Sequence, residues 1–454
     1  MVFSSLIFLL FFMPLTVLVS CILPGRLKNP FLFIASLFFY AWGEPIYVTL
    51  MLGSITVHYF AARLIENYPR KDAKRLIASA IPIGVSIIVF ILFKYLGGIL
   101  GLSLPIGISF YTFQIISYTI DVYRGKIEAE KNFITLGTYI SLFPQLIAGP
   151  IVRFTDVRGS LHNRVITGND LYFGLRYFVF GLFKKVVFAN QVGKLWQEIS
   201  GNITEATLIT AWIGGLAFTM QIYFDFSGYS DMAIGLGRML GFSFPENFRY
   251  PYVSKSITEF WRRWHITLSS WFRDYIYIPL GGSRRGNVRQ IVNLFIVWSL
   301  TGIWHGAGFN FLLWGVYYFV FLVLEKFILK GILERLPGIV SHIYTLVIVI
   351  FGWMIFESEG IYVFKNTMAS LLGAHGIIDS MSFYYIRTNW FMLLIMTMAS
   401  MGAFKGIFGF YSENENNYSG KRIFAGGILI IGGIFVSIAY LTGDSYNPFL
   451  YFRF

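Results

Sequence analysis

Residues 76–97 read LIASAIPIGVSIIVFILFKYLG, and this stretch decides the fold class. It is long enough to cross the hydrocarbon core of a bilayer, which takes about 20 predominantly apolar residues, and Lys94 is its only charged residue. The whole chain has this character, because apolar types make up 56% of the 454 residues, charged types only 13%, and the mean hydropathy is +0.64. This composition excludes a soluble enzyme, a disordered chain and a repeat solenoid, and it predicts an all-α polytopic membrane protein.

Apolar stretches that could cross or half-cross a membrane recur along the chain. Two of them are broken, because 104–122 opens with Leu-Pro-Ile-Gly and 133–150 contains Pro144 and Pro150. Broken backbone at membrane depth is tolerated only where it is buried in protein or lines a cavity, so we expect 133–150 to re-enter and the protein to be a compact enzyme or transporter. We find no internal repeat and expect a single membrane-embedded domain over 1–454. The stretches lie at 3–23, 30–43, 45–65, 76–97, 104–122, 133–150, 171–191, 206–225, 290–304, 308–330, 339–356, 391–409 and 422–441.

The charge pattern concerns orientation rather than nucleic acid. The chain holds 36 Lys and Arg against 23 Asp and Glu, a net charge of +13, and basic residues between apolar stretches orient helices and meet anionic headgroups. Such residues follow the first, third and fifth stretches, for example Arg26, Arg70 and Arg124, which predicts an N-terminus on the outer side. Cys21 is the only cysteine, and no His-Glu-x-x-His or close histidine pair suggests a metal site.

One segment, about 243–289, is unusually polar and aromatic. Tryptophan and tyrosine beside arginine are typical of the membrane interface, where the rings lie at headgroup depth. Thr258 followed by Trp261 and Trp264 predicts an N-cap and a helix that lies in the plane of the membrane. We therefore expect a polar interfacial helical segment here.

Among the six histidines, His305 is the strongest candidate for chemistry. It lies between two apolar stretches, and an ionisable residue within a membrane segment is costly and is a functional candidate by default. Gly302, Gly306 and Gly308 would let another group approach the imidazole closely. A buried histidine that only bonds a neighbour remains the alternative. His265, between Trp264 and Ile266, is by itself better explained as an ordinary interfacial residue.

Other motifs are weaker. Asp225 and Asp231 lie in an apolar region broken by glycine, where they could form a proton relay, although a structural pair that holds Arg or backbone is favoured. Residues 281–286, GGSRRG, lack the P-loop Lys-Ser/Thr and are interpreted as a basic cytoplasmic loop. The chain has no Gly-x-Ser-x-Gly, which argues against a serine hydrolase.

Several long motifs together resemble the membrane-bound O-acyltransferase (MBOAT) family, in particular the bacterial alginate O-acetyltransferase branch, which is similar to the teichoic-acid D-alanyl transferases. The resemblance covers most of the chain. It implies a bowl of about a dozen spanning and re-entrant helices around a tunnel. The motifs are 104–114 (LPIGISFYTFQ), 143–151 (FPQLIAGPI), 224–235 (FDFSGYSDMAIG), 245–252 (PENFRYPY), 257–282 (ITEFWRRWHITLSSWFRDYIYIPLGG) and 300–307 (LTGIWHGA).

The resemblance also implies roles for residues. His305 matches the family's invariant catalytic histidine and His265 matches the second histidine of the pair. A thioester needs little acid help to react, whereas a hydroxyl nucleophile needs a base, and an imidazole can supply one. His265, Asn310 or a backbone carbonyl could fix the tautomer or polarise the acyl carbonyl, and the sequence does not choose among them. The candidate tunnel-lining or supporting residues are Trp304, Asn310, Asp274 and Arg273.

The C-terminal residues 449–454, FLYFRF, resemble the ending typical of this branch and the terminal motif of the small partner peptide in the teichoic-acid system. That likeness makes Tyr451 a candidate acyl relay. A phenol has a pKa of about 10, so its ester lies between a thioester and a sugar ester in transfer potential. An aromatic anchor at the membrane interface remains the favoured alternative.

The sequence and the resemblance together predict an O-acetyltransferase in the bacterial cytoplasmic membrane. We expect it to take an acyl group from a cytoplasmic thioester, acetyl-CoA or acyl-carrier protein, without a bound cofactor or metal. The group would cross the membrane to a hydroxyl, for O-acetylation of an extracytoplasmic, alginate-like polysaccharide through an SGNH-hydrolase-like partner. The alternatives are a transporter of lipid-linked glycan or another envelope precursor, and an inactive scaffold.

Overall fold

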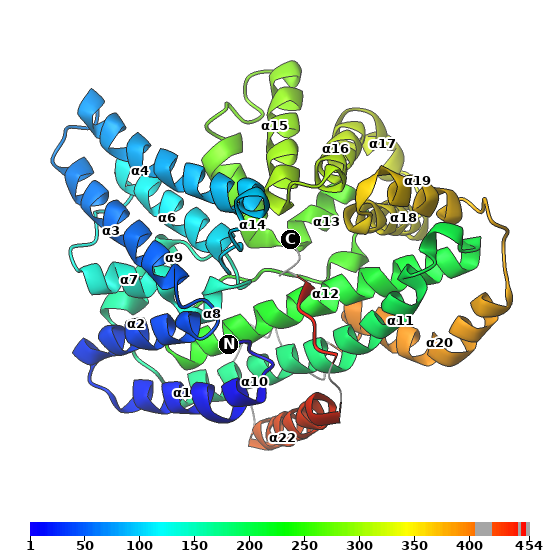
Figure 1. The fold of residues 1–454 in the computed structure, drawn as a ribbon, viewed down its shortest axis with the longest axis horizontal. Coiled ribbons are helices and arrows are strands. Elements are labelled where there is room, and N and C mark those ends of the chain that lie inside the picture. Colours follow the sequence, from blue (N-terminus) through cyan, green and yellow to red (C-terminus); the bar gives the residue numbers. More distant parts are fainter. Residues whose placement is uncertain (405–419, 444–445, 451–454) are drawn as a thin grey trace. The chain divides into compact units, whose positions relative to one another are not determined.

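The computed structural model describes residues 1–404, 420–443 and 446–450, and all regular secondary structure in these residues is helical. The expected all-α class is therefore confirmed (Figure 1). Within the described residues, five helical stretches are long and apolar enough to span a membrane, which agrees with a multi-pass membrane protein. These stretches are Tyr47–Glu66, Ala73–Leu100, Phe309–Leu333, Gly338–Glu357 and Ile423–Gly443.

Contacts between residues group the chain into two compact units. Unit 1 consists of Met1–Leu182 and Tyr229–Glu246, and unit 2 consists of Phe183–Gly228 and the described residues from Asn247 onward. The long helix α12 (Leu208–Met239) contributes its first part to unit 2 and its end to unit 1. The expectation of one membrane domain over 1–454 stays a prediction.

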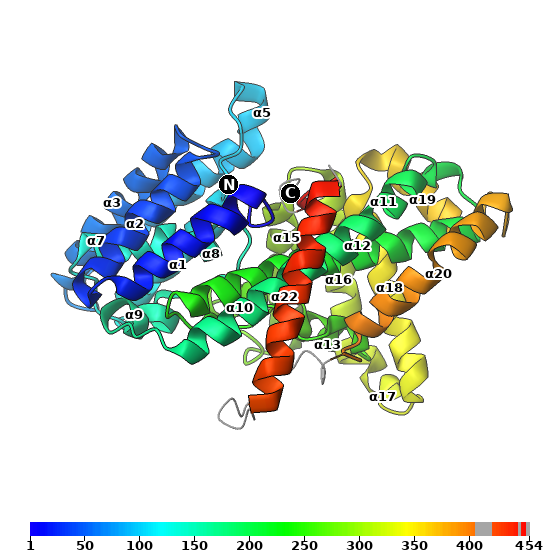
Figure 2. The ribbon, with the colours of Figure 1, turned by 90° about the horizontal axis from the view of Figure 1, so that it is seen from below.

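Unit 1 contains the helices from α1 to α10 (Figures 1 and 2). Helices α3, α4 and α6 pack against one another, and α2 packs against α1 and α7. The bounds are η1 (Phe8–Phe12), α1 (Met13–Ile22), α2 (Gly25–Ala41), α3 (Tyr47–Glu66), α4 (Ala73–Ile91), η2 (Leu92–Leu96), α5 (Gly97–Leu100), α6 (Ile108–Tyr123), α7 (Phe133–Ser141), α8 (Phe143–Leu146), α9 (Phe154–His162) and α10 (Gly168–Phe183).

A buried histidine ties three of these helices together. The His58 ring of α3 lies 2.6 Å from the Thr119 hydroxyl of α6 and 2.8 Å from the Ser86 hydroxyl of α4. Each ring nitrogen thus has a partner in an otherwise apolar packing, which is the condition for burying a polar group at acceptable cost. His58 is therefore a structural histidine.

The sequence breaks at 104–122 and 133–150 are real breaks in helical structure. Helix α7 ends at Ser141 and the short α8 begins at Phe143, with Pro144 in its first turn. Helix α6 begins only after Gly107, whose φ of 76° favours glycine and whose added Cβ would lie 2.5 Å from the Leu146 carbonyl oxygen. The close approach of these two breaks requires glycine. Re-entry of 133–150 into a membrane stays a prediction.

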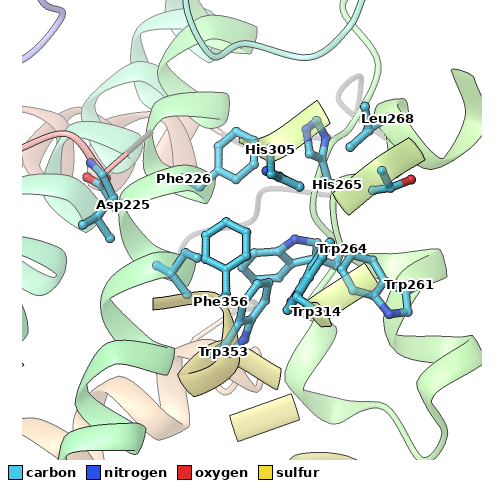
Figure 3. A pocket seen from close by; sticks show the side chains of 13 residues that line it. Asp225, Phe226, Trp261, Trp264, His265, Leu268, His305, Trp314, Trp353 and Phe356 are labelled. Carbon is cyan, nitrogen blue, oxygen red and sulfur yellow. The ribbon is translucent and has the colours of Figure 1, made fainter. Parts of the chain in front are cut away.

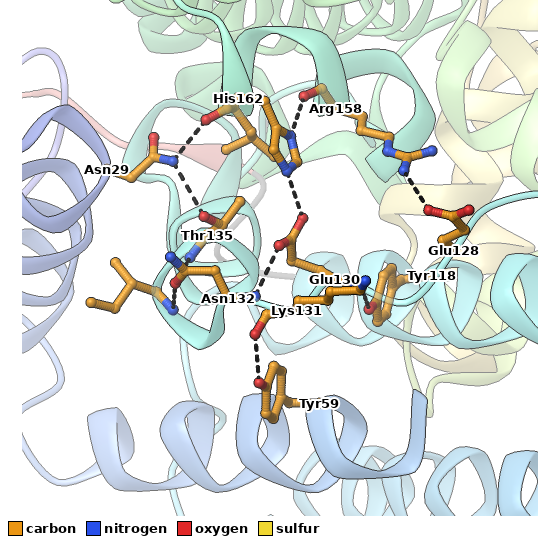
Figure 4. Close-up of polar contacts among 12 residues, drawn as sticks. Asn29, Tyr59, Tyr118, Glu128, Glu130, Lys131, Asn132, Thr135, Arg158 and His162 are labelled. Carbon is orange, nitrogen blue, oxygen red and sulfur yellow. Dashed lines mark hydrogen bonds and ion pairs between the residues drawn. The ribbon is translucent and has the colours of Figure 1, made fainter. Parts of the chain in front are cut away.

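A polar network fixes the loop before α7 in unit 1 (Figure 4). The Glu130 carboxylate lies 3.1 Å from Nε2 of His162 at the end of α9, and the Glu130 amide donates to the Tyr118 hydroxyl at 2.8 Å. The Tyr59 hydroxyl donates to the Lys131 carbonyl at 2.8 Å. Because these partners come from α3, α6 and α9, the network holds the loop against three helices.

Unit 2 contains the remaining helices and the aromatic segment (Figure 1). Within it, α15 and α16 form a closely packed helix pair. The bounds are η3 (Lys184–Ala189), α11 (Asn190–Ser200), η4 (Ile203–Glu205), η5 (Pro251–Val253), α13 (Ile257–Arg263), α14 (Ile266–Phe272), η6 (Arg273–Tyr277), α15 (Asn287–His305), α16 (Phe309–Leu324), η7 (Glu325–Leu329), α17 (Lys330–Leu333), α18 (Gly338–Glu357), α19 (Gly360–Leu371), α20 (Ser380–Ser400) and α22 (Gly420–Gly443).

The aromatic segment is helical as expected, but its N-cap is not Thr258. Ser256 caps α13, because its hydroxyl accepts the Glu259 amide at 3.0 Å. Thr258 lies inside the first turn, and its hydroxyl donates to the Glu325 carboxylate at 2.8 Å. Serine and threonine are both good caps, so the pattern alone could not separate positions two residues apart. The orientation of α13 in a membrane stays a prediction.

Candidate active site

His305 is the last residue of α15. Its ring is half-buried and lies edge-on to Trp314 and Phe356, with both ring centroids 5.1 Å away. The glycines around it have the expected effect, since a Cβ at Gly302 would lie 2.4 Å from the Phe311 carbonyl oxygen and one at Gly306 would lie 2.4 Å from the Phe311 ring. Only glycine lets α16 return this close to the histidine.

His265 joins α13 to α14 in a left-handed conformation, with φ 43° and ψ 53°. A non-glycine residue pays roughly 1–2 kcal/mol for this backbone, and such strain clusters at functional sites. The ring is buried, and its Nδ1 lies 3.0 Å from Oδ1 of Asn247. The strained backbone thus carries a buried imidazole that is held at Nδ1.

The contacts of Asn247 fix the tautomer of His265. Oδ1 of Asn247 also accepts the Thr267 amide at 3.3 Å and the Thr267 hydroxyl at 2.8 Å. The amide can only donate, so this atom is the carbonyl oxygen and the facing Nδ1 of His265 must carry a proton. Burial lowers the pKa of His265 to about 3, which keeps the ring neutral near pH 7. Nε2 of His265 is then an acceptor, and it has no hydrogen-bond partner among the described residues.

Both histidines line one cavity of about 40 Å³ (Figure 3). The Trp304 ring connects them, with its centroid 4.8 Å from that of His305 and 6.3 Å from that of His265. Figure 3 shows Phe226 beside the histidines and a group of aromatic rings, Trp264, Trp314, Trp353 and Phe356, on the other side of the cavity. The lining residues are Ile222, Asp225, Phe226, Trp261, Trp264, His265, Leu268, Thr301, His305, Trp314, Trp353, Phe356 and Leu450.

The supporting candidates fall into different places. Trp304 is buried against both histidines, as described. Asn310 is buried at the start of α16, where its side chain donates to the Phe356 carbonyl, so it holds the residue whose ring contacts His305. Arg273 and Asp274 form an ion pair with each other at 2.7 Å on η6 and do not line the cavity. Tyr451 lies outside the described residues.

The contacts of Asp225 are those of a structural carboxylate, which the sequence analysis favoured over a proton relay. Its carboxylate lies 2.6 Å from the Lys185 ammonium and accepts the Leu450 amide at 2.8 Å. Both side chains of the ion pair are buried. The carboxylate thus pairs with a cation and with backbone, and it lies at the edge of the histidine cavity.

The sequence reasoning missed Asn247 and Lys185. Asn247 stands inside the quoted motif 245–252, but nothing in the pattern marked it as the partner of a histidine 18 residues later. Lys185 could have been found, because it is a charged residue within the apolar stretch 171–191, and an intramembrane charge is expected to have a specific partner.

Comparison with known proteins gives the same family as the motifs. The model of the MBOAT, membrane-bound O-acyltransferase family, matches residues 130–364, which include both histidines of the cavity. The chain is 36% identical to the probable alginate O-acetylase AlgI of Pseudomonas putida over the full length of both chains. It is 30% identical to the peptidoglycan O-acetyltransferase of Helicobacter pylori over 100% of this chain and 98% of that one.

A third relative is the teichoic acid D-alanyltransferase of Bacillus subtilis, with 26% identity over 58% of this chain and 68% of the relative. This more distant match agrees with the resemblance seen in the motifs. The long alignments to the acetylating relatives, together with the family match over more than half of the chain, identify the class of protein. The chain belongs to the membrane-bound O-acyltransferase family and is an integral multi-pass membrane O-acyltransferase.

Proposed function

We propose that this enzyme transfers an acetyl group from a cytoplasmic thioester to a hydroxyl on the outer side of the membrane, for O-acetylation of an extracytoplasmic polysaccharide. The observation that carries the proposal is the placement of His305 and His265 on one small, aromatic-walled cavity. The relatives named for acetylation of alginate and peptidoglycan support a polysaccharide as the final acceptor.

In the proposed step, His305 is the general base. It takes the proton of the acceptor hydroxyl as the oxygen attacks the acyl carbonyl, so that a C–O bond forms and the C–S bond breaks. The thiolate leaves and receives the proton from the imidazolium, which returns His305 to its neutral form. The aromatic walls exclude water, which would otherwise hydrolyse the thioester.

His265 is proposed to assist through Nε2. Because Nδ1 is held as a donor to Asn247, Nε2 presents a lone pair that can accept a hydrogen bond from the hydroxyl or from a water in the cavity. A neutral His265 thus orients a donor rather than stabilising an oxyanion. The oxyanion would need another donor from the cavity wall or from the substrate.

The remaining parts of the proposal come from the family resemblance. A passage must connect the cavity to both faces of the membrane, and the acyl donor is acetyl-CoA or an acyl-carrier protein. The immediate acceptor is a hydroxyl of an SGNH-hydrolase-like partner or Tyr451 of this chain, from which the group passes to the polysaccharide. A phenyl ester lies between a thioester and a sugar ester in transfer potential, so each step would run downhill.

The test is an acyl-transfer assay with purified protein in detergent. Radiolabelled acetyl-CoA and acetylated acyl-carrier protein are offered in turn, and thiol release is followed. We expect His305→Ala to lower the rate by at least about 10²-fold, as for loss of a general base, while protein yield and thermal stability are retained. His375→Gln, at an exposed histidine away from the cavity, is the matched control. If the His305→Ala enzyme stays active, His305 is not the general base of the reaction.

A further inference from the structure

A second feature of the histidine cavity is that part of its wall comes from the far end of the chain. Leu450 lines the cavity and is 3% exposed. It lies more than 140 residues beyond His305 in the sequence, in a short segment after α22 (red in Figure 1) that has little regular structure of its own. Something other than local helical structure must hold this segment in place.

The buried ion pair of Lys185 and Asp225 supplies that hold. The Lys185 ammonium donates to the Pro448 carbonyl and to Oδ1 of Asn190, the latter at 2.9 Å. The Asp225 carboxylate accepts the Leu450 amide at 2.8 Å. The pair therefore satisfies one backbone acceptor and one backbone donor that flank Phe449.

A further hydrogen bond fixes the start of the segment after α22. The side chain of Asn190 donates to Oδ1 of Asn447 at 3.2 Å. Charged side chains buried in pairs gain little net stability over apolar ones of the same shape, so stability alone does not account for this pair. Here the pair positions residues 447–450, which we call the C-terminal strap.

Because the cavity is small, the strap limits the size of the group that can bind in it. Its volume is about 40 Å³, and one water needs at least about 10–15 Å³ of such space. The cavity therefore takes about three water-sized groups, which is the number of heavy atoms in an acetyl group. Other parts of the wall are tryptophan and phenylalanine rings that pack against one another, so the cavity cannot expand there without disturbing the aromatic packing.

We propose that the C-terminal strap is the specificity-determining wall of the acyl site, with Leu450 limiting the acyl group to two or three carbons and the Lys185–Asp225 pair as the positioning device. The inference rests on the proposed function of the cavity. It assigns the substrate class as short-chain acyl thioesters. It also assigns Lys185 and Asp225 a role that acts through Leu450 and not through the reacting atoms.

The experiment compares acetyl, propionyl and butyryl groups, each offered on CoA and on acyl-carrier protein, with the full-length enzyme. We expect Leu450→Ala to raise kcat/KM for butyryl relative to acetyl by at least about tenfold, because one methylene in a closed apolar pocket is worth about 10–200-fold in discrimination. Leu429→Ala, at an exposed leucine of α22, is the matched control and should leave the ratio unchanged.

The positioning role is tested by the double variant Lys185→Met and Asp225→Asn, which removes both charges and leaves neither unpaired. We expect the butyryl-to-acetyl ratio to rise as in Leu450→Ala. In a Cys21→Ser background, a cysteine probe introduced by Leu450→Cys should react slowly with a maleimide when the pair is intact and at least about tenfold faster in the double variant, since local opening governs access. This readout does not depend on catalysis.

The outcomes separate the two ideas. If Leu450→Ala leaves the butyryl-to-acetyl ratio of kcat/KM unchanged while acetyl transfer is normal, Leu450 does not determine acyl specificity. That result would leave the proposed function unaffected. Equal maleimide rates with and without the ion pair would overturn the positioning role. A wild-type enzyme that releases thiol from none of the acyl donors would overturn the proposed function, and the specificity inference with it.

Discussion

The sharpest prediction concerns Asn247, because a single side-chain oxygen accepts three hydrogen bonds, from Nδ1 of His265 and from the amide and hydroxyl of Thr267. Asn247→Leu keeps the volume and removes the acceptor. Two buried donors, the His265 Nδ1–H and the Thr267 amide, then have no acceptor. Each unsatisfied donor lowers the free energy of unfolding by about 1–3 kcal/mol. The Thr267 hydroxyl can rotate to another partner. We therefore expect a destabilisation of about 2–6 kcal/mol at this joint between α13 and α14.

The same substitution releases the tautomer of His265. The proton can then reside on Nε2, which turns this acceptor into a donor. We expect kcat for acetyl transfer to fall by about 10–100-fold, the usual effect of losing a partner that orients a functional histidine, with a smaller change in KM. Asn247→Asp should retain most activity, because it keeps the acceptor for all three donors. Its negative charge should raise the pKa of His265 from about 3.

The assay is steady-state acetyl transfer from pH 5 to 9 on detergent-purified variants, with thermal unfolding as the check on folding. The diagnostic result is the difference between the leucine and aspartate variants of Asn247. If Asn247→Leu folds and retains wild-type kcat, the tautomer of His265 has no part in the reaction. If both variants lose activity equally while folded, the acceptor oxygen is not what matters, and the reasoning is refuted.

Three further predictions concern stability in detergent. Because burial lowers the pKa of His265 from 6.5 to about 3, the unfolded state binds more protons in this interval, so the unfolding free energy should fall as pH drops below 6.5, by up to about 1.4 kcal/mol per pH unit. His265→Asn, which tolerates the left-handed backbone, should flatten this slope in thermal scans at pH 7.5 and 5.5. Glu325→Gln should lower the melting temperature, at a cost of about 1–3 kcal/mol, because the carboxylate accepts two amides and a hydroxyl in the first turn of α13; an unchanged melting temperature would contradict this. Gly302→Ala should destabilise by about 1–3 kcal/mol, because the added Cβ would clash with the Phe311 carbonyl oxygen, whereas Gly331→Ala, with nothing within 4 Å, should be neutral or stabilising.

Much of the fold could be predicted from the sequence, because apolar length and helix-breaking residues act locally. The unbroken stretch 76–97 lies within the helical run Ala73–Leu100, and the breaks at 104–122 and 133–150 appear where proline and glycine stand. The N-cap at Ser256 was missed by two residues because several residues in that stretch could cap equally well. The grouping of residues into units depends on long-range packing, which no local pattern reports.

The candidate site was only partly predictable. His305 was found as an ionisable residue between apolar stretches and His265 from the motif resemblance, whereas their presence on one cavity depends on tertiary packing. Family membership now makes an enzyme the established class and leaves the transporter alternative without support. Arg273 and Asp274 were candidates for a tunnel-lining or supporting role; they pair with each other on η6 and do not line the cavity, and that role stays a prediction.

Both histidines stand where a helix stops, and this placement has a physical reason. A side chain in the middle of a packed helix has helical turns on both sides, whereas His305 is the last residue of α15 and His265 joins α13 to α14. The free-energy cost of ending a helix at each histidine must then be offset by contacts with neighbouring residues. Asn247 bonds the turn at His265 through both its side chain and its carbonyl, which accepts the Ile266 amide at 2.9 Å. Gly302 and Gly306 let α16 approach His305 closely. Residues that stabilise the breaks should therefore affect the rate of acyl transfer almost as strongly as the histidines, although they touch no substrate.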